Sequence, residues 1–283
     1  MTQAGNEAHP LPALLQRWRS ELAAWAIPQH ITAAVTESPW VLPRTMFARR
    51  ADRVSAAPSG SSFERARAAL DLPGTVLDVG SGAGAASLPL LPWCTGLTAV
   101  DEHADMLQLL ADRAARHGVV PRLITGTWPA AAADAGRADV VTCHHVSFNV
   151  AEIEPFLSAL TAAARRVVVL EMTAVHPLVA LNELWLRFHG LVRPTGPTAD
   201  DLLAILAAMG IRAESERWVR PGGRDYGSLA ELADVTRRRL CLPPERSGEV
   251  GQALVDSGVD PDTPADPGSS GREVVTIWWD GSR

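Results

Sequence analysis

Residues 76–84 read Val-Leu-Asp-Val-Gly-Ser-Gly-Ala-Gly, and this stretch decides the fold. Its first half predicts a buried strand, and Gly80, Gly82 and Gly84 predict a tight turn after it. Glycines at such a turn let the backbone come close to a ligand, where any Cβ would collide. Gly80 and Gly82, with Ala85, also satisfy the dinucleotide-binding pattern Gly-x-Gly-x-x-Gly/Ala, so the spacing alone leaves the nucleotide open.

The chain around this turn alternates between apolar strands and helices. The predicted strands are Thr75–Val79, Gly96–Val100, Arg122–Thr125, Asp139–Thr142, Arg166–Glu171, Ile211–Val219 and Arg272–Trp279. The predicted helices are Ser62–Leu70, Ala104–Gly118, Glu152–Ala164, Pro177–Leu191, Thr198–Gly210, 229–240 and 245–257, and a glycine-rich turn followed by a helix is predicted over Gly80–Leu91. This alternation predicts βαβ units, and therefore an α/β protein with a mainly parallel sheet and helices on both faces.

The N-terminal part has a different pattern. Residues 10–26 show helical spacing of apolar side chains, and short helices are expected over 31–36 and 44–54. Residues 1–61 are therefore predicted to form a helical cap, followed by one domain over 62–283. A helical insertion on the substrate side of that domain is expected at about 177–210.

Composition excludes several classes of protein. The chain has no lysine, so a Schiff-base lysine and a phosphate-loop lysine are both impossible. A net charge of −6 argues against a nucleic-acid surface. The N-terminal sequence lacks the features of a signal peptide and the chain has no long apolar run, so we expect a cytoplasmic protein with no membrane contact. Three scattered cysteines signal neither a disulfide framework nor zinc, and no metal site is expected.

Two carboxylates narrow the choice of nucleotide that this turn could bind. Asp101 ends the second strand 21 residues after Gly80, where its carboxylate can accept both ribose hydroxyls of a nucleoside. Asp78 directly precedes the glycines, a poor place for an acid facing a pyrophosphate but a good one for supporting the cationic amine of a methionine moiety. The stretch from Asp78 to Gly84 resembles the first motif of class I methyltransferases, and Asp101-Glu102 resembles their second.

The resemblance continues along the chain. Residues 126–129 resemble the loop that holds adenine, although Thr127 stands where that family often has aspartate; Trp128 could flank the ring or simply cover an apolar edge. Residues 138–145 resemble the fourth motif, which meets the methionine moiety and the acceptor. The resemblance implies a Rossmann-like, mostly parallel seven-stranded sheet with an antiparallel last strand, and S-adenosylmethionine as cofactor. The residues it implies for the cofactor are Asp78, Gly80, Ser81, Gly82, Gly84, Asp101, Glu102, Thr127, Trp128, Cys143 and His144.

Histidines are the candidates for acid–base chemistry. His144 and His145 follow the fourth strand, at the edge where open α/β sheets bind ligands, and one of them should point into the cleft. His176 follows the fifth strand and could face the same cleft. A general base is needed only if the acceptor must lose a proton, so each of these residues is equally open to a purely lining role.

The cap supplies two further candidates. Arg50 is the arginine we expect to pair with the carboxylate of the methionine moiety, although a solvated helix face is the alternative. Trp18, Trp25 and Trp40 precede the sheet and Trp185 follows the fifth strand, so these rings either roof a pocket for an apolar or planar acceptor or bury the cap against the core.

We therefore predict transfer of a methyl group from S-adenosylmethionine to a small-molecule acceptor with an oxygen, nitrogen or carbon nucleophile. Because the sulfonium is already activated, positioning can supply most of the acceleration. The alternatives are a nicotinamide-dependent oxidoreductase, although the Tyr-x-x-x-Lys pair of one such class is absent, and a non-catalytic S-adenosylmethionine-binding protein. The protein is expected to be a monomer or a homodimer.

Overall fold

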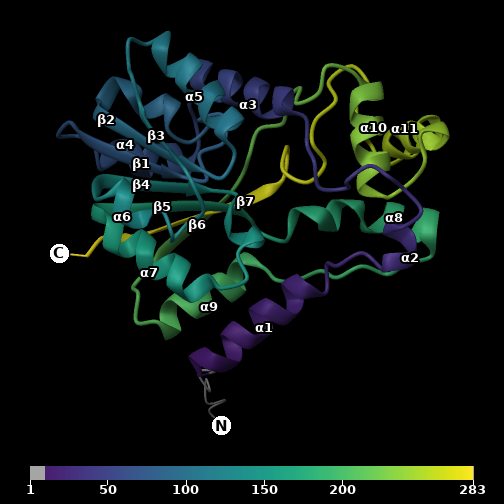
Figure 1. The fold of residues 1–283 in the computed structure, drawn as a ribbon, viewed down its shortest axis with the longest axis horizontal. Coiled ribbons are helices and arrows are strands. Elements are labelled where there is room, and N and C mark those ends of the chain that lie inside the picture. Colours follow the sequence, from purple (N-terminus) through teal and green to yellow (C-terminus); the bar gives the residue numbers. More distant parts are fainter. Residues whose placement is uncertain (1–9, 283) are drawn as a thin grey trace, which may run out of the picture.

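The computed structural model describes residues 10–282, so the first nine residues of the predicted cap lie outside the described part. One sheet organises the molecule (Figure 1), with the strand order β3-β2-β1-β4-β5-β7-β6. The strands are β1 (Gly74–Val79), β2 (Cys94–Asp101), β3 (Arg122–Thr125), β4 (Ala138–His144), β5 (Ala164–Thr173), β6 (Glu214–Val219) and β7 (Glu273–Asp280). This seven-stranded, Rossmann-like sheet confirms the predicted fold class.

Strand direction follows from the connections. β1 pairs in parallel with both β2 and β4, and β4 pairs in parallel with β5. β7 runs antiparallel to both β5 and β6, so β6 has the direction of β5. The carboxyl ends of β1, β2, β4, β5 and β6 therefore lie along one edge of the sheet, which is the edge that binds ligands in open α/β sheets.

Helices cover both faces of the sheet (Figure 1). One face packs against α4 (Ser61–Ala68), the 3-10 helix η1 (Leu88–Trp93) and α5 (Ala104–Ala115). The other face packs against α6 (Ala132–Ala135), α7 (Ile153–Ala163) and α9 (Ala199–Ala208), and α1 (Leu11–Ala23) lies on α9. None of the helices between residues 10 and 282 has the length and hydropathy needed to cross a membrane.

A third apolar cluster forms a helical lobe beside the sheet (Figure 1). It contains α2 (Gln29–Thr32), α8 (Asn182–His189), α10 (Leu229–Arg239) and α11 (Ser247–Asp256). The remaining 3-10 helices are Ser147–Asn149, Pro177–Leu181 and Pro244–Arg246. The helix α3 (Arg44–Ala56) joins the lobe to the sheet, because Met46 packs in the lobe and Ala51 packs in the cluster over the sheet. The helices of the predicted cap are thus shared among three clusters.

The glycine-rich turn predicted within Gly80–Leu91 is confirmed, but the helix predicted to follow it is wrong. Residues 82–87 form turns, and only the single 3-10 helix η1 follows them. Gly82 and Gly84 have φ of 51° and 91°, which no right-handed helix allows. Pro89 and Pro92 then remove backbone donors, which favours short helical turns over a continuous α-helix.

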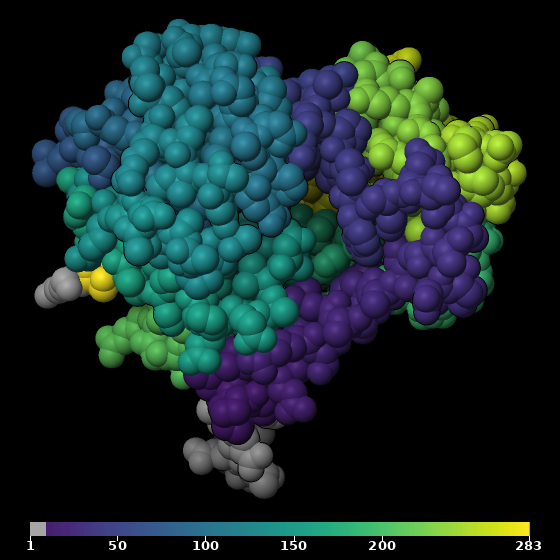
Figure 2. Space-filling view, in the orientation of Figure 1, coloured from purple at the N-terminus to yellow at the C-terminus, as the bar shows by residue number. Residues whose placement is uncertain are grey.

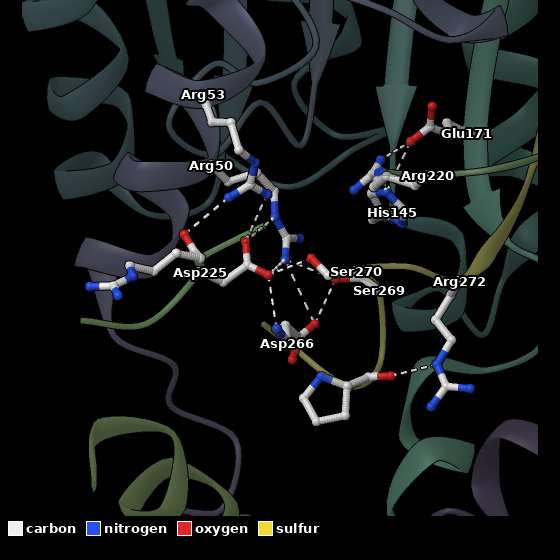
Figure 3. Close-up of polar contacts among 12 residues, drawn as sticks. Arg50, Arg53, His145, Glu171, Arg220, Asp225, Asp266, Ser269, Ser270 and Arg272 are labelled. Atoms are coloured by element: carbon white, nitrogen blue, oxygen red, sulfur yellow. Dashed lines mark hydrogen bonds and ion pairs between the residues drawn. The ribbon is translucent and has the colours of Figure 1, made fainter. Parts of the chain in front are cut away.

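A buried carboxylate holds α3 against the segments that enter the lobe (Figure 3). Asp225 has a fully buried side chain and accepts hydrogen bonds from Arg53 at 2.9 Å and from the backbone N–H of Asp266 at 2.8 Å. Arg50 lies 3.4 Å from the same carboxylate, and Ser270 also donates to it. Burial opposes ionisation of Asp225, but the charge of Arg50 and these donors lower its pKa to about 2.

This network makes a prediction for acid stability. The folded-state pKa of Asp225 is depressed, so its contribution is present above the unfolded pKa near 4 and is lost as pH falls toward 2. The shift corresponds to about 2 kcal/mol of unfolding free energy in wild type. Asp225→Asn should lower stability at pH 7 by about 3 kcal/mol, because it removes the buried charge that Arg50 and Arg53 share, and should lack this part of the acid-dependent loss.

Urea unfolding of both proteins between pH 7 and pH 2 measures the effect. The matched control is Asp262→Asn, an exposed position in the loop that contains Asp266, which should leave stability unchanged within error. Equal stability of Asp225→Asn and wild type at pH 7 would contradict the role given to this carboxylate.

Candidate active site

The glycine turn that follows β1 is hydrogen-bonded to the end of the neighbouring strand β2. The N–H groups of Gly80 and Ser81 both donate to the carbonyl of Val100, at 2.9 and 3.1 Å, and the N–H of Gly82 donates to Asp101 Oδ2 at 2.8 Å. Gly80 has a φ of 67°, in the left-handed region that favours glycine. The turn therefore lies directly beside the carboxylate that ends β2.

Asp101 lies at the rim of this turn with some access to solvent. Its other oxygen accepts the N–H of His103 at 2.9 Å. Each carboxylate oxygen can accept more than one hydrogen bond, so both retain capacity for hydroxyl groups of a ligand. Glu102, next to it, has an exposed side chain.

Asp78 is buried under the turn, where both of its oxygens already have partners in the protein. Ser87 donates to one oxygen at 2.6 Å and Thr142 donates to the other at 3.0 Å. Burial raises the pKa of Asp78 to about 6. In the structure this carboxylate links β1 to β4 and to the end of the glycine turn, and its predicted contact with the methionine amine stays a prediction.

Three buried polar atoms near the carboxyl ends of β1 and β4 have no hydrogen-bond partner among residues 10–282. They are Ser81 Oγ, His144 Nε2 and Ser147 Oγ. A buried polar group without a partner costs free energy, and such groups in a native fold need an explanation. Their position beside the glycine turn fits a polar ligand that supplies the missing hydrogen bonds.

The predicted adenine loop follows β3 at the same edge. Thr127 is exposed, and Trp128 donates its indole N–H to the carbonyl of Phe156 at 3.3 Å. The Trp128 ring packs on the core beneath α7, which matches the apolar-edge alternative, and contact with adenine stays a prediction.

The end of β4 sends its side chains to opposite faces. Cys143 is fully buried in the core on the α7 side, and burial raises the pKa of its thiol. His144 pairs in register with Glu171 of β5, so both point to the other face. Cys143 therefore offers only its backbone to the site.

Glu171, His145 and Arg220 form an ionic cluster at this face (Figure 3). The Glu171 carboxylate lies 3.1 Å from His145 Nε2 and accepts a bond from Arg220, which follows β6 and reaches past β7. Burial opposes the charge of Glu171, but Arg220 and the two histidines hold its pKa well below the usual value. The sequence prediction missed Arg220, because no local pattern places the end of β6 beside β5.

His176 belongs to a different group of side chains. Its ring stacks on Trp25 with centroids 4.3 Å apart and packs at 5.0 Å against Phe148, while its Nδ1 accepts the N–H of Leu178. Burial, with Arg239 and Arg193, lowers the pKa of His176 to about 4. The structure thus brings His144 and His145 together and places His176 among aromatic rings.

Arg50 is engaged inside the protein. It donates to Ser269 at 2.8 Å and lies 3.4 Å from Asp225 and 3.7 Å from Asp266. An approach to a cofactor carboxylate would require this arginine to give up some of these contacts, so that role stays a prediction. Asp225 and Asp266 were not expected from the sequence, since they lie far from Arg50 along the chain.

The surface of the molecule is hollowed beside the segment that contains α3. Figure 2 shows the molecule hollowed between the teal segments of the sheet and the purple segment that contains α3, with green and yellow atoms at its base.

The comparisons with known proteins agree with this geometry. Residues 76–169 match a family model described as a methyltransferase domain, and this region runs from β1 through the glycine turn, Asp101 and the end of β4 into β5. This part of the chain is therefore similar to a methyltransferase domain, and the strand order is that of the Rossmann-like methyltransferase fold.

Two solved structures are similar in fold. The YcgJ protein from Bacillus subtilis is 17% identical, with a TM-score of 0.51 over 78% of this chain and 98% of its own. The plantazolicin methyltransferase BpumL, solved in complex with SAH (S-adenosylhomocysteine), is 12% identical, with a TM-score of 0.50 over 96% of this chain and 99% of its own. A search of curated proteins found no matching sequence.

The closeness of Gly80 to Val146 makes a prediction. A Cβ on Gly80 would lie 2.3 Å from Val146 Cγ2, whereas a Cβ on Gly118, at a similar φ of 72°, would meet no atom within 4 Å. Gly118→Ala should therefore cost only the left-handed backbone strain of about 1 kcal/mol. Gly80→Ala should cost this strain and about 1–3 kcal/mol more for the clash.

Chemical denaturation of the two variants measures the difference. Val146→Ala in the Gly80→Ala background should restore part of the lost stability, because it removes the colliding methyl group. Equal costs at Gly80 and Gly118 would show that the valine does not confine this turn.

Proposed function

We propose that the protein methylates a small-molecule acceptor bound in the hollow between α3 and the carboxyl edge of the sheet. The observation that carries this proposal is the carboxyl edge of the sheet, where the glycine turn and Asp101 meet and Ser81 and His144 have unpartnered buried polar atoms. A hollow inside the fold suits a small molecule better than a duplex or a folded protein. The net charge of −6 also argues against a nucleic-acid acceptor.

The residues at this edge fit the methyl donor. Asp101 retains acceptor capacity for ribose hydroxyls, Gly80 and Gly82 leave room for close approach of a ligand, and Ser81 and His144 offer unpartnered polar atoms. Bound S-adenosylmethionine supplies a methyl group on a cationic sulfur, which makes that carbon electrophilic. The protein then needs to orient the acceptor and exclude water, and positioning of this kind can supply much of a rate enhancement.

The arrangement of helices supports a division of the chain into a cap, a domain and an insertion. We assign residues 1–61 to a cap, residues 62–283 to the methyltransferase domain, and about 177–210 to a substrate-side insertion. Support comes from α3, which borders the hollow, and from Trp25 of the N-terminal segment, which stacks on His176 just before the insertion. We assign the protein to the cytoplasm, because its three cysteines are free, as expected in a reducing compartment.

Calorimetric titration with S-adenosylmethionine, S-adenosylhomocysteine and NAD tests the nucleotide. The first two should bind and NAD should not, and Asp101→Ala should weaken their binding roughly tenfold or more, because charge-assisted hydrogen bonds to the ribose are lost. The matched control is Asp112→Ala, an exposed aspartate of α5 that bonds only Gln108 and should leave affinity unchanged. Binding of NAD alone would replace the methyltransferase with the oxidoreductase alternative.

Transfer of a radioactive methyl group tests the acceptor. The protein, labelled S-adenosylmethionine and a cell extract are incubated, and the extract is divided beforehand by size into small molecules and macromolecules. Label should enter the small-molecule fraction only. Label in protein or nucleic acid would refute the acceptor class, and cofactor binding without transfer to any fraction would favour the non-catalytic alternative.

A further inference from the structure

A small pocket in the helical lobe combines positive charge with aromatic rings. Three tryptophans and two arginines contribute to its lining, namely Trp25, Trp40, Trp185, Arg193 and Arg239. They come from the segments on either side of α2, from α8 and the segment after it, and from the end of α10, which lie together at one side of the molecule (Figure 1). No acidic side chain of residues 10–282 lines this pocket.

Arg193 is a buried cation without a counter-charge. It is 7% exposed, and no carboxylate of residues 10–282 forms an ion pair with it. Its guanidinium donates to the carbonyls of Trp25 and Ala26 and lies over the rings of Trp25 and Trp185, at 5.6 and 5.0 Å from their centroids. Burial lowers the pKa of Arg193. Carbonyl dipoles and ring faces offset part of the cost of burying this charge, and an anion would offset more.

One donor of Arg193 is left over. Its Nε is buried and has no hydrogen-bond partner among residues 10–282. A buried donor without an acceptor costs the full desolvation of that group. The pocket that Arg193 lines has a volume of about 10 Å3, which is room for one water-sized group. A water molecule would supply the missing acceptor alone, whereas a carboxylate oxygen would supply both the acceptor and the missing negative charge.

Arg239 and Trp40 are the members of the lining that are open to a ligand. Among residues 10–282, the half-buried guanidinium of Arg239 forms no salt bridge and no hydrogen bond. Trp40 is 57% exposed and stacks on no aromatic ring of the described residues, whereas Trp25 and Trp185 already pack against histidine rings. The cavity is too small for a ring, so the aromatic part of a ligand would lie outside it, where Trp40 offers a face for stacking.

Aromatic rings connect this pocket with the carboxyl edge of the sheet. The ring of Trp25 stacks on His176 with centroids 4.3 Å apart, and His176 packs at 5.0 Å against Phe148. Phe148 belongs to the short 3-10 helix directly after β4, next to Ser147 and its unpartnered hydroxyl. A ligand held at Arg193 is therefore close to the edge where the methyl donor is proposed to bind.

We propose that this pocket binds the carboxylate of an aromatic acid, held by Arg193 Nε and Arg239 with its ring on Trp40, and that this acid is the methyl acceptor. The second part rests on the proposed function and narrows its small-molecule acceptor to an anionic, planar one. The carboxylate is an anchor rather than the methylated group, because an oxygen paired with guanidinium groups is a poor nucleophile.

The transfer step takes place elsewhere on the acid. A nucleophilic oxygen, nitrogen or carbon of the acceptor bonds the methyl carbon. The bond from that carbon to sulfur breaks with its electron pair on sulfur, which becomes a neutral thioether, and the proton displaced from the nucleophile passes to water. The product therefore keeps its carboxylate.

NMR titration of the protein with benzoate, without any other ligand, tests the site. The matched probe is benzamide, which keeps the ring and loses the charge. The indole N–H signals of Trp40 and Trp185 are assigned through their loss in Trp40→Phe and Trp185→Phe. Benzoate should shift both signals and benzamide should bind roughly tenfold more weakly, because charge-assisted hydrogen bonds are lost. Equal binding of the two probes, or no shift of these signals with benzoate, would overturn the proposal.

Variants test the individual residues by the same titration. Arg193→Met and Arg239→Gln should each weaken benzoate binding roughly tenfold, and Trp40→Ala should weaken it about fivefold. The matched control is Arg212→Gln, which removes the same charge at an exposed position before β6 and should leave affinity unchanged. Arg239 and Trp40 make no contact on which folding depends, so their variants decide the outcome even where Arg193→Met does not fold. Wild-type affinity in both would refute the site.

Methyl transfer and cofactor binding separate the acceptor from the function on which it rests. In the extract assay, the labelled product should pass into organic solvent from acidified water and stay behind in alkaline water, as an aromatic acid does. A labelled product that passes into the solvent from both would refute the acid as acceptor and leave the proposed function standing. Absence of S-adenosylhomocysteine binding to wild type would refute the proposed function, and the benzoate titration would still decide the carboxylate site.

Discussion

The parallel pairing of β1 with β2 on one side and with β4 on the other is the constraint on which the site depends. The chain passes from β1 to β2 on one side and crosses from β3 to β4 on the other. In open α/β sheets, ligands bind outside the carboxyl ends of the strands at the point where the strand order reverses in this way. The glycine turn after β1, Asp101 at the end of β2 and His144 at the end of β4 therefore meet at one edge. Each strand contributes a different chemical group, and none of these groups alone would define a binding site.

Buried carboxylates link the segments that lie beside this edge. Asp225 ties α3 to the loop before α10, and Glu171 ties the end of β4 to the segment after β6. A buried ion is costly unless several donors compensate it, so each carboxylate here collects more than one. Such pairs add less to stability than to geometry, because they fix the relative positions of segments far apart in sequence.

The sequence was sufficient wherever the signal was local. Apolar runs and the glycine turn predicted the strands, and the spacing from Gly80 to Asp101 predicted the nucleotide edge. Helix prediction failed at 80–91, because apolar composition outweighed Pro89 and two left-handed glycines. Arg220 was missed because its partner lies two strands away in the sheet, and only the antiparallel insertion of β7 between β5 and β6 brings the two together.

Charge balance around the hollow bears on what it can accept. Two ionic clusters each compensate their own charges: Arg50 and Arg53 face Asp225 and Asp266, and Arg220 faces Glu171. Neither cluster carries an excess positive charge that would repel a sulfonium, and burial lowers the pKa of both His144 and His145.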